Sequence, residues 1–165
     1  MDQQTFSQRC EYFNMVHGVT LRGIDAFSDR DLDFRPRPGM RTPRELVFHV
    51  YSQEKILAEA AQQGRFSAEA ASRSSPEGEA GEAELQALVT VNDLKTYAQA
   101  CHQVAQAIFS VMSESELNHP VESHLGTHPA WRYFTFAYDE HWHHRGQLYT
   151  YLRLLGKEPP LLYDY

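Results

Sequence analysis

The sequence has no excess of basic residues, no long apolar run and almost no cysteine. Its 165 residues carry 15 Lys and Arg against 22 Asp and Glu, a formal net charge of −7. This acidic balance argues against binding to nucleic acid or to an anionic membrane surface, which normally requires a basic patch. No apolar stretch approaches the length of a membrane span, and the start MDQQTFSQRCEYF lacks the basic and apolar segments of a signal peptide. We therefore expect a cytoplasmic protein whose partners include neither nucleic acid nor membrane.

The two cysteines, Cys10 and Cys101, are not paired in any spacing typical of a metal site. Both fall within segments that have helical periodicity. We expect buried free thiols, which pack as small apolar side chains, and assign them no chemistry.

Apolar residues that recur at helical spacing predict four long helices. Four amphipathic helices bury their apolar stripes most simply as an up-down bundle, so the predicted fold is all-α, a single four-helix-bundle domain over residues 1–165. The connections from the first helix to the second and from the third to the fourth are long for a bundle, which leaves room for crossovers. The predicted helices run from Thr5 to about Phe27, from Pro43 onward, from about Asp93 to Met112 and from about Ala130 to Gly156.

Small and polar residues dominate two of the segments between these helices. Residues 64–81, GRFSAEAASRSSPEGEAG, show no periodic pattern and are predicted to be a mobile or loosely packed loop. A short helix or turn should follow before the third helix. Residues 113–129 contain Pro120, Gly126 and Pro129 around the alternating stretch VESHL, and are predicted to form a loop or a small hairpin.

The second helix has the clearest start signal in the chain. In Thr42-Pro43-Arg44-Glu45 the threonine hydroxyl can accept from the amide of Glu45 while the glutamate carboxylate reaches back, and proline suits the first helical position. The apolar stripe of this helix carries His49 in its second turn. If His49 stood alone, it would be interpreted as a core histidine hydrogen-bonded to a polar neighbour. The last helix, however, supplies a possible partner ligand for it.

Four other histidines are expected to be structural or solvated. His17 falls beside the apolar stripe of the first helix, where a hydrogen-bonded core histidine is expected. His119, His124 and His128 lie in the predicted loop or hairpin, where side chains are usually solvated, although loops over a scaffold often carry function.

Three histidines and one acid lie within five residues of the predicted last helix, in the run EHWHH. With Glu140 at zero and about 100° per residue, His144 lies at about 40°. On the same scale His141 lies at about 100° and His143, which points away, at about −60°. The larger apolar residues of the helix fall between about 20° and 120°, which makes that side the buried one. His144 and His141 therefore point into the protein, whereas Glu140 lies at the edge of its buried face.

The i, i+4 spacing of Glu140 and His144 lets both side chains reach one ion beside the helix. A divalent transition ion such as zinc or nickel takes imidazole and carboxylate ligands at about 2 Å. His49, on the inward stripe of the second helix, is the candidate third ligand. Three protein ligands would leave a position at which a bound water or thiol becomes a nucleophile. The alternative is a polar helix face with one or two buried histidines and no metal.

Two runs of the sequence resemble the DinB family, which is related to YfiT-like metal hydrolases and bacterial thiol transferases. HHRGQLYTYLRLLGKEPP, which contains His144, is similar to the last-helix signature, and PGMRTPRELVFH, which ends in His49, is similar to the second-helix entry. The resemblance implies a DinB-type bundle that binds a divalent ion through one histidine of the second helix and two of the last, spaced HxxxH. His49 and His144 match this pattern. Glu140 stands at the remaining position, with His141 as its substitute one residue along.

The resemblance also implies a function and an assembly. The family's activities imply a metal-dependent transferase that activates a low-molecular-weight thiol, such as bacillithiol, mycothiol or glutathione, or a hydrolase that uses metal-bound water on a small-molecule substrate. The alternative is a non-catalytic metal-binding stress-response bundle, and in either case a homodimer is expected. Arg145 and Gln147 are expected to support the ligands by hydrogen bonds. A ferritin-like di-iron site is disfavoured. Such a site needs two Glu-x-x-His motifs, and only Glu140 with His143 has that spacing here.

Overall fold

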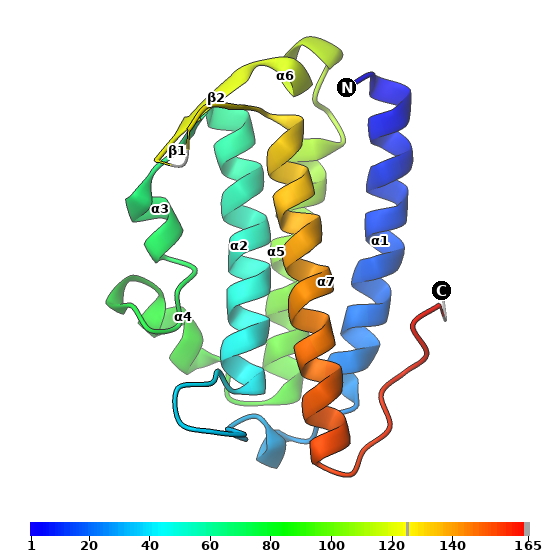
Figure 1. Ribbon diagram of the computed structural model, residues 1–165, viewed down its shortest axis with the longest axis vertical. Coiled ribbons are helices and arrows are strands. Elements are labelled where there is room, and N and C mark those ends of the chain that lie inside the picture. The colour runs from blue at the N-terminus through cyan, green and yellow to red at the C-terminus, as the bar shows by residue number, and fades with distance from the viewer. Residues whose placement is uncertain (125, 164–165) are drawn as a thin grey trace.

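Four long helices form a bundle in the computed structural model, which describes residues 1–124 and 126–163 (Figure 1). The predicted all-α bundle is confirmed, and the helices begin and end within a few residues of their predicted bounds. The long helices are α1 (Gln3–Asp25), α2 (Pro43–Gln63), α5 (Val91–Phe109) and α7 (Trp131–Leu154). The short elements are η1 (Asp29–Asp31), β1 (Arg65–Phe66), α3 (Ala68–Ser72), η2 (Glu79–Gly81), α4 (Glu82–Ala87), α6 (Glu114–Asn118), β2 (Pro120–Ser123) and β3 (His128–Pro129).

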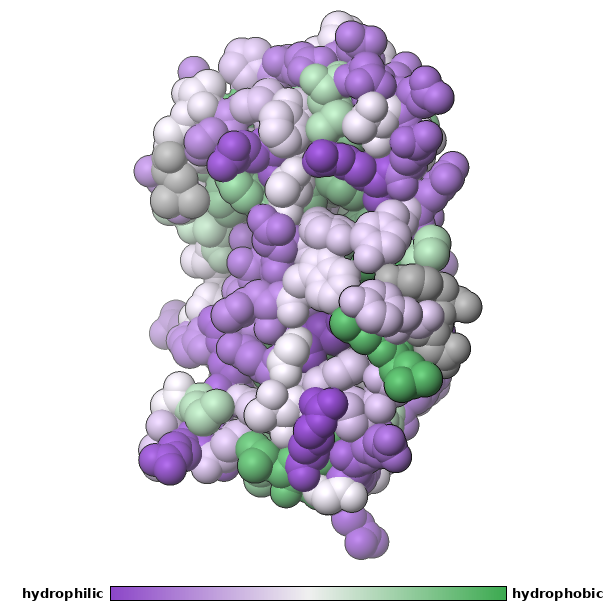
Figure 2. All heavy atoms as spheres, turned by 45° about the vertical axis from the view of Figure 1, so that its right-hand side comes forward, coloured by the Kyte–Doolittle hydropathy of each residue, from purple (hydrophilic) through white to green (hydrophobic). Residues whose placement is uncertain are grey.

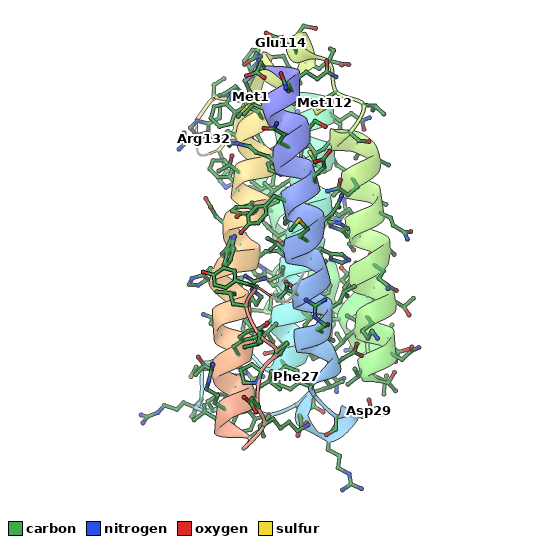
Figure 3. All side chains as sticks on the ribbon, turned by 90° about the vertical axis from the view of Figure 1, so that its right-hand side faces the viewer. Met1, Phe27, Asp29, Met112, Glu114 and Arg132 are labelled. Atoms are coloured by element: carbon green, nitrogen blue, oxygen red, sulfur yellow. The ribbon has the colours of Figure 1, made fainter. Side chains whose placement is uncertain are left out.

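The helices do not simply alternate in direction. In Figure 1, α1 and α7 descend while α2 and α5 both rise, so α2 and α5 are parallel. The crossover lies in residues 64–90, which return along the outside of α2 and carry α3 and α4. The sequence analysis allows crossovers at the other two connections, from α1 to α2 and from α5 to α7. In Figure 3, α1 stands between α5 and α7, with Met1 at the same end as Met112, and Phe27 and Asp29 at the opposite end.

Capping boxes fix the starts of α2 and α5. Thr42 accepts from the Glu45 amide over 3.2 Å and donates its own amide to the Glu45 carboxylate over 2.8 Å, as the sequence predicted. Thr90 and Asp93 form the same motif at α5, so that helix begins two residues before its expected start. The predicted short helix ahead of it is α4.

The segment 64–81, predicted to be a mobile or loosely packed loop, contains short regular elements and close contacts with α2 that the sequence did not predict. This segment contains β1 and α3, and Ser67 caps α3 by accepting from the Ala70 amide over 3.0 Å. Gly81 is needed for close packing, because a Cβ there would lie 2.6 Å from the Phe48 ring. Ser74 is buried. At Gly81 and Ser74, a small side chain therefore permits close approach to α2.

The predicted hairpin over residues 113–129 is confirmed and is preceded by a short helix. β2 pairs antiparallel with β3, with Val121 opposite His128, and parallel with β1. The sequence reading missed α6, although Ser113 and Glu116 carry the capping-box signal.

The apolar core is divided along the bundle axis into two clusters with a polar layer between them. The break lies between Val16 and Val19 on α1, Tyr51 and Ile56 on α2, Cys101 and Ala105 on α5, and Ala137 and Leu148 on α7. Buried polar residues of this layer include His17, Glu54, His102, His141 and His144. Buried polar groups are costly unless hydrogen-bonded, so this layer is where function or specificity is to be sought.

Outside this layer the molecule has the expected distribution of side chains. Cys10 and Cys101 are buried and unpaired, as predicted, and burial raises their pKa to about 12 and about 11, respectively. Hydrophilic residues cover most of the face shown in Figure 2. No described helix is both long enough and apolar enough to cross a bilayer.

Candidate metal centre

His49 of α2 meets Glu140 and His144 of α7 at the edge of the polar layer. His144 Nε2 lies 3.0 Å from Glu140 Oε2, and His49 Nε2 lies 3.4 Å from the same oxygen. One ligand atom from each residue lies within 4.8 Å of the other two. We call these three residues the outer cluster.

Local structure explains why these side chains converge. Glu140 and His144 are one turn apart on α7, so their side chains project from the same side of the helix. His49 lies in the second turn of α2, close to the start that the Thr42 box fixes. The side chains of His49 and Glu140 are 16% and 33% exposed, against 9% for His144. Solvent therefore reaches the cluster from the side of His49 and Glu140.

Hydrogen bonds fix the tautomer of both histidines. His49 Nδ1 donates to the backbone oxygen of Ser74 over 2.7 Å. His144 Nδ1 donates to Gln147 Oε1 over 2.7 Å. These oxygens only accept, so the hydrogen of each neutral ring lies on Nδ1 and the lone pair lies on Nε2. Both Nε2 lone pairs therefore face the Glu140 carboxylate.

The carboxylate oxygen at the centre of this cluster is an unsatisfied acceptor. Glu140 Oε2 is buried and has no hydrogen-bond partner among the described residues, despite the two nearby nitrogens. Hydrogen bonding to His144, and after it to His49, lowers the pKa of Glu140 well below its ordinary value, which requires a ring proton or a cation between these nitrogens and the carboxylate. An ionised oxygen and two nitrogen lone pairs repel one another unless a positive charge lies between them.

The residues present fit a divalent transition ion. Two imidazole nitrogens and one carboxylate oxygen are donors that zinc and nickel accept. Metal-binding histidines usually donate their second ring nitrogen to a carbonyl or carboxylate, as His49 and His144 do here. Three protein ligands would leave at least one coordination position, on the solvent side.

His141, the predicted substitute for Glu140, has a different partner. Its Nε2 lies 2.9 Å from Glu54 Oε2, and its side chain is fully buried. His143 is exposed, as the helical wheel predicted. The structure thus brings Glu140 and His144 to His49, and directs His141 to the opposite side of the buried face.

The two predicted supporting residues have different roles. Gln147 holds the ring of His144, as expected. Arg145 is buried instead against α1: its Nη1 donates to the backbone oxygen of Val16 over 3.4 Å, and its guanidinium carbon lies 4.1 Å from the Trp142 ring centre.

Sequence reasoning missed a second cluster of one glutamate and two histidines. Glu54, which is fully buried, lies 2.7 Å from His102 Nδ1 and 2.9 Å from His141 Nε2. Burial alone would raise the pKa of Glu54, but hydrogen bonds from the two histidines outweigh it and lower the pKa to about 2. We call Glu54, His102 and His141 the inner cluster. Its sequence signal is that Glu54 follows Val50 by four residues and precedes Leu57 by three, which places it on the apolar stripe of α2.

His17 adjoins the inner cluster, in agreement with the prediction of a hydrogen-bonded core histidine. Its ring stacks on that of His102, with centroids 3.7 Å apart and planes 8° apart, and its Nδ1 lies 3.0 Å from the Tyr51 hydroxyl. Burial, followed by the neighbouring His102, lowers the pKa of His17 to about 3. The ring is therefore neutral at physiological pH. The loop histidines His119, His124 and His128 lie outside both clusters.

The fold and the site together define a four-helix bundle with a candidate interhelical metal centre of two histidines and a glutamate. The DinB family model matches residues 1–165, and the chain belongs to the DinB family. A DinB-like protein of Bacillus subtilis, YjoA, has a similar structure, with a TM-score of 0.72 and 20% sequence identity over 94% of this chain and 96% of that one. At this identity the similarity concerns the fold alone. No curated protein matches the chain.

Proposed function

We propose that His49, Glu140 and His144 bind one divalent transition ion, with zinc and nickel as the candidates, and that the site serves a metal-dependent enzyme. The observation that carries the proposal is the convergence of two Nε2 lone pairs on one ionised carboxylate oxygen. A proton on one ring would relieve only part of this repulsion, whereas a divalent ion would use all three donors at once.

The partial exposure of the site favours catalysis over a purely structural role. Structural zinc sites normally use four protein ligands, whereas catalytic sites use three and keep one position open. A divalent ion so held lowers the pKa of a water or thiol bound beside it, which supplies a nucleophile near neutral pH. Transfer to or from a low-molecular-weight thiol and hydrolysis by water are the two reactions that this chemistry and the family membership support.

A non-catalytic role is the second candidate, because the ligands come from two different helices. An ion bound by His49 and by the pair on α7 would link α2 to α7 and stabilise the bundle. In that case metal binding would raise the melting temperature of the protein. No coordination position on the ion would be open to a thiol.

Metal binding is tested by titrating zinc and nickel into protein without a histidine tag, using calorimetry. We expect one ion per chain, and we expect His49→Ala to weaken binding by more than about 100-fold, the upper end of what loss of a merely supporting group costs. His143→Ala is the matched control, because His143 is an exposed histidine on α7 beside His144. Absence of binding, or equal binding by His49→Ala, would refute the proposal.

Thiol-transferase chemistry is tested by adding glutathione or 2-mercaptoethanol to the cobalt-loaded protein. An open position predicts a new near-ultraviolet absorption from a thiolate bound to cobalt, and its loss in His144→Ala. No change in the spectrum at saturating thiol would favour the non-catalytic role or the hydrolase.

Three further expectations follow from the sequence and the family: a homodimer, a single domain over residues 1–165 and a cytoplasmic location. Light scattering after size-exclusion chromatography would test the dimer, because the molar mass should be twice that of the 19.0 kDa chain.

A further inference from the structure

One residue from each long helix takes part in a hydrogen-bonded chain across the bundle. His102 of α5 has both ring nitrogens against oxygens, Nε2 at 2.8 Å from Asn14 Oδ1 of α1 and Nδ1 at 2.7 Å from Glu54 Oε1 of α2. Glu54 Oε2 accepts from His141 Nε2 of α7 over 2.9 Å. Since Glu54 and His141 are fully buried, water does not compete for the bond between them.

We infer that Glu54 is a positioning residue for the outer cluster, because its bond to His141 fixes the rotation and the height of α7 against α2. The inference rests on the proposed function, since it concerns the geometry of the same metal ligands. Neither Glu54 nor His141 would touch the ion.

The position of the bond supports this role. His141 is the residue directly after Glu140 and lies three residues before His144, so it belongs to the same turn of α7 as both ligands. Glu54 follows His49 by five residues on α2. The bond between Glu54 and His141 therefore joins the same two helices as the outer cluster, about one and a half turns away along α2.

A metal site needs this control because it tolerates little rotation. Side-chain ends lie about 6 Å from a helix axis, so turning α7 by about 20° would move the Glu140 carboxylate by about 2 Å. Metal–ligand distances hold to about 0.2 Å. The rotation of α7 must accordingly be fixed to within a few degrees.

Fully buried apolar side chains of α7 are fewer at the level of the site than above and below it. Between Ala137 and Leu148 on α7, no residue belongs to the buried part of either apolar cluster, and Tyr138 and Trp142 pack against the apolar cluster that contains Ala137 while partly exposed. A buried hydrogen bond to a carboxylate has a defined length and direction. Because His141 Nδ1 has no hydrogen-bond partner among the described residues, the bond to Glu54 is the hydrogen bond that orients this ring, which also packs edge-on against Phe13 and Tyr51 with centroids 4.9 Å apart.

The test compares two substitutions of His141. In His141→Gln the side-chain amide can donate from near the position of Nε2, so the bond to Glu54 is retained. In His141→Leu the side chain fills the space and the bond is lost. We expect His141→Leu to weaken zinc binding by about 10- to 100-fold, as loss of groups that orient ligands does, and His141→Gln to restore most of the affinity. Zinc affinity is measured by competition with a chromophoric chelator.

The cobalt form gives a second readout, which a general loss of stability would not change. Its visible absorption depends on the angles between ligands, so displaced Glu140 and His144 should shift the bands in His141→Leu and leave them in place in His141→Gln. Glu54→Met removes the same bond from the other side and serves as the test if His141→Leu does not fold.

Asn14→Ala is the matched control, because it cuts the same hydrogen-bonded chain at the bond to His102 and leaves the bond from α2 to α7 intact. We expect unchanged zinc affinity and cobalt absorption in Asn14→Ala. A wild-type chain that binds neither zinc nor cobalt refutes the proposed function. A wild-type chain that binds both, with the same affinity and spectrum in folded His141→Leu or Glu54→Met, overturns this inference alone.

Discussion

The outer and inner clusters contain the same residue types, one glutamate and two histidines, but their hydrogen atoms are arranged differently. In the inner cluster, ring nitrogens contact both oxygens of the Glu54 carboxylate. In the outer cluster, both rings donate to oxygens elsewhere, and their lone pairs face Glu140. The first arrangement is complete with protons alone, whereas the second needs an additional ring proton or the metal ion that we propose there.

The two clusters also differ in how deeply their glutamates are buried. The Glu54 side chain is fully buried, whereas that of Glu140 is 33% exposed. A fully buried carboxylate must be neutralised by its neighbours when the chain folds, whereas the partial exposure of the Glu140 side chain gives solvent access to the outer cluster. We conclude that the histidine and glutamate content of a helix pair does not by itself identify a metal site. The partners of the ring nitrogens separate the inner cluster from the outer cluster, for which we propose a metal ion.

The largest predicted difference between the clusters is in stability. Glu54→Ala should lower the free energy of unfolding by about 3–5 kcal/mol, because it leaves two buried histidines without their shared partner. Glu140→Ala, measured in chelator, should lower it by about 1 kcal/mol or less, as expected for a partly exposed charge. Urea denaturation measures both. Equal losses would mean that the clusters have the same role.

The next largest difference is the response to metal. Zinc at 100 times its Kd should stabilise the wild-type chain by about 2.7 kcal/mol, because the ion binds the folded state. The melting temperature should not respond in His144→Ala and should respond normally in His143→Ala. A rise that persists in His144→Ala would place the ion elsewhere.

A smaller difference is the response of the inner region to acid. The pKa of His17 is about 3 in the folded chain against an ordinary value of 6.5. Between these values the unfolded chain binds more protons than the folded chain, so the free energy of unfolding falls as pH is lowered. From pH 6.5 to 5 this one group should cost about 1.5 kcal/mol.

His17→Asn should remove this part of the pH dependence, because asparagine can keep a hydrogen bond to the Tyr51 hydroxyl but does not titrate. The exposed His143→Asn should leave the slope unchanged. Urea denaturation at pH 6.5 and 5 measures the difference. An unaltered slope in His17→Asn would show that His17 is not held neutral by burial.

Much of this fold could be predicted from local signals. The 3.6-residue periodicity and the Thr42 box gave four helices with nearly correct bounds, because amphipathic stripes and caps act within a few residues. The crossover between α2 and α5 and the packing of residues 64–81 could not be predicted so easily. Gly81 and Ser74 read as loop residues in the sequence, and their role as close contacts depends on α2 lying beside them.

The outer cluster could be predicted in part, and the inner cluster was missed. The i, i+4 spacing of Glu140 and His144 and the inward position of His49 are properties of single helices, so they can be read from the sequence. Glu54 and His102 belong to different helices, 48 positions apart, and meet only in the folded bundle. A charged residue at an apolar position of α2, Glu54, was the available signal, and the sequence analysis did not use it.

The account is tested most directly by X-ray absorption at the zinc edge of the zinc-loaded chain without a tag. We predict two imidazole ligands and further oxygen donors at about 2.0–2.2 Å, with no sulfur at about 2.3 Å. In His144→Ala, any residual zinc should show only one imidazole. A sulfur ligand from Cys10 or Cys101, or a spectrum that is unchanged in His144→Ala, would contradict the assignment of the metal centre to the outer cluster.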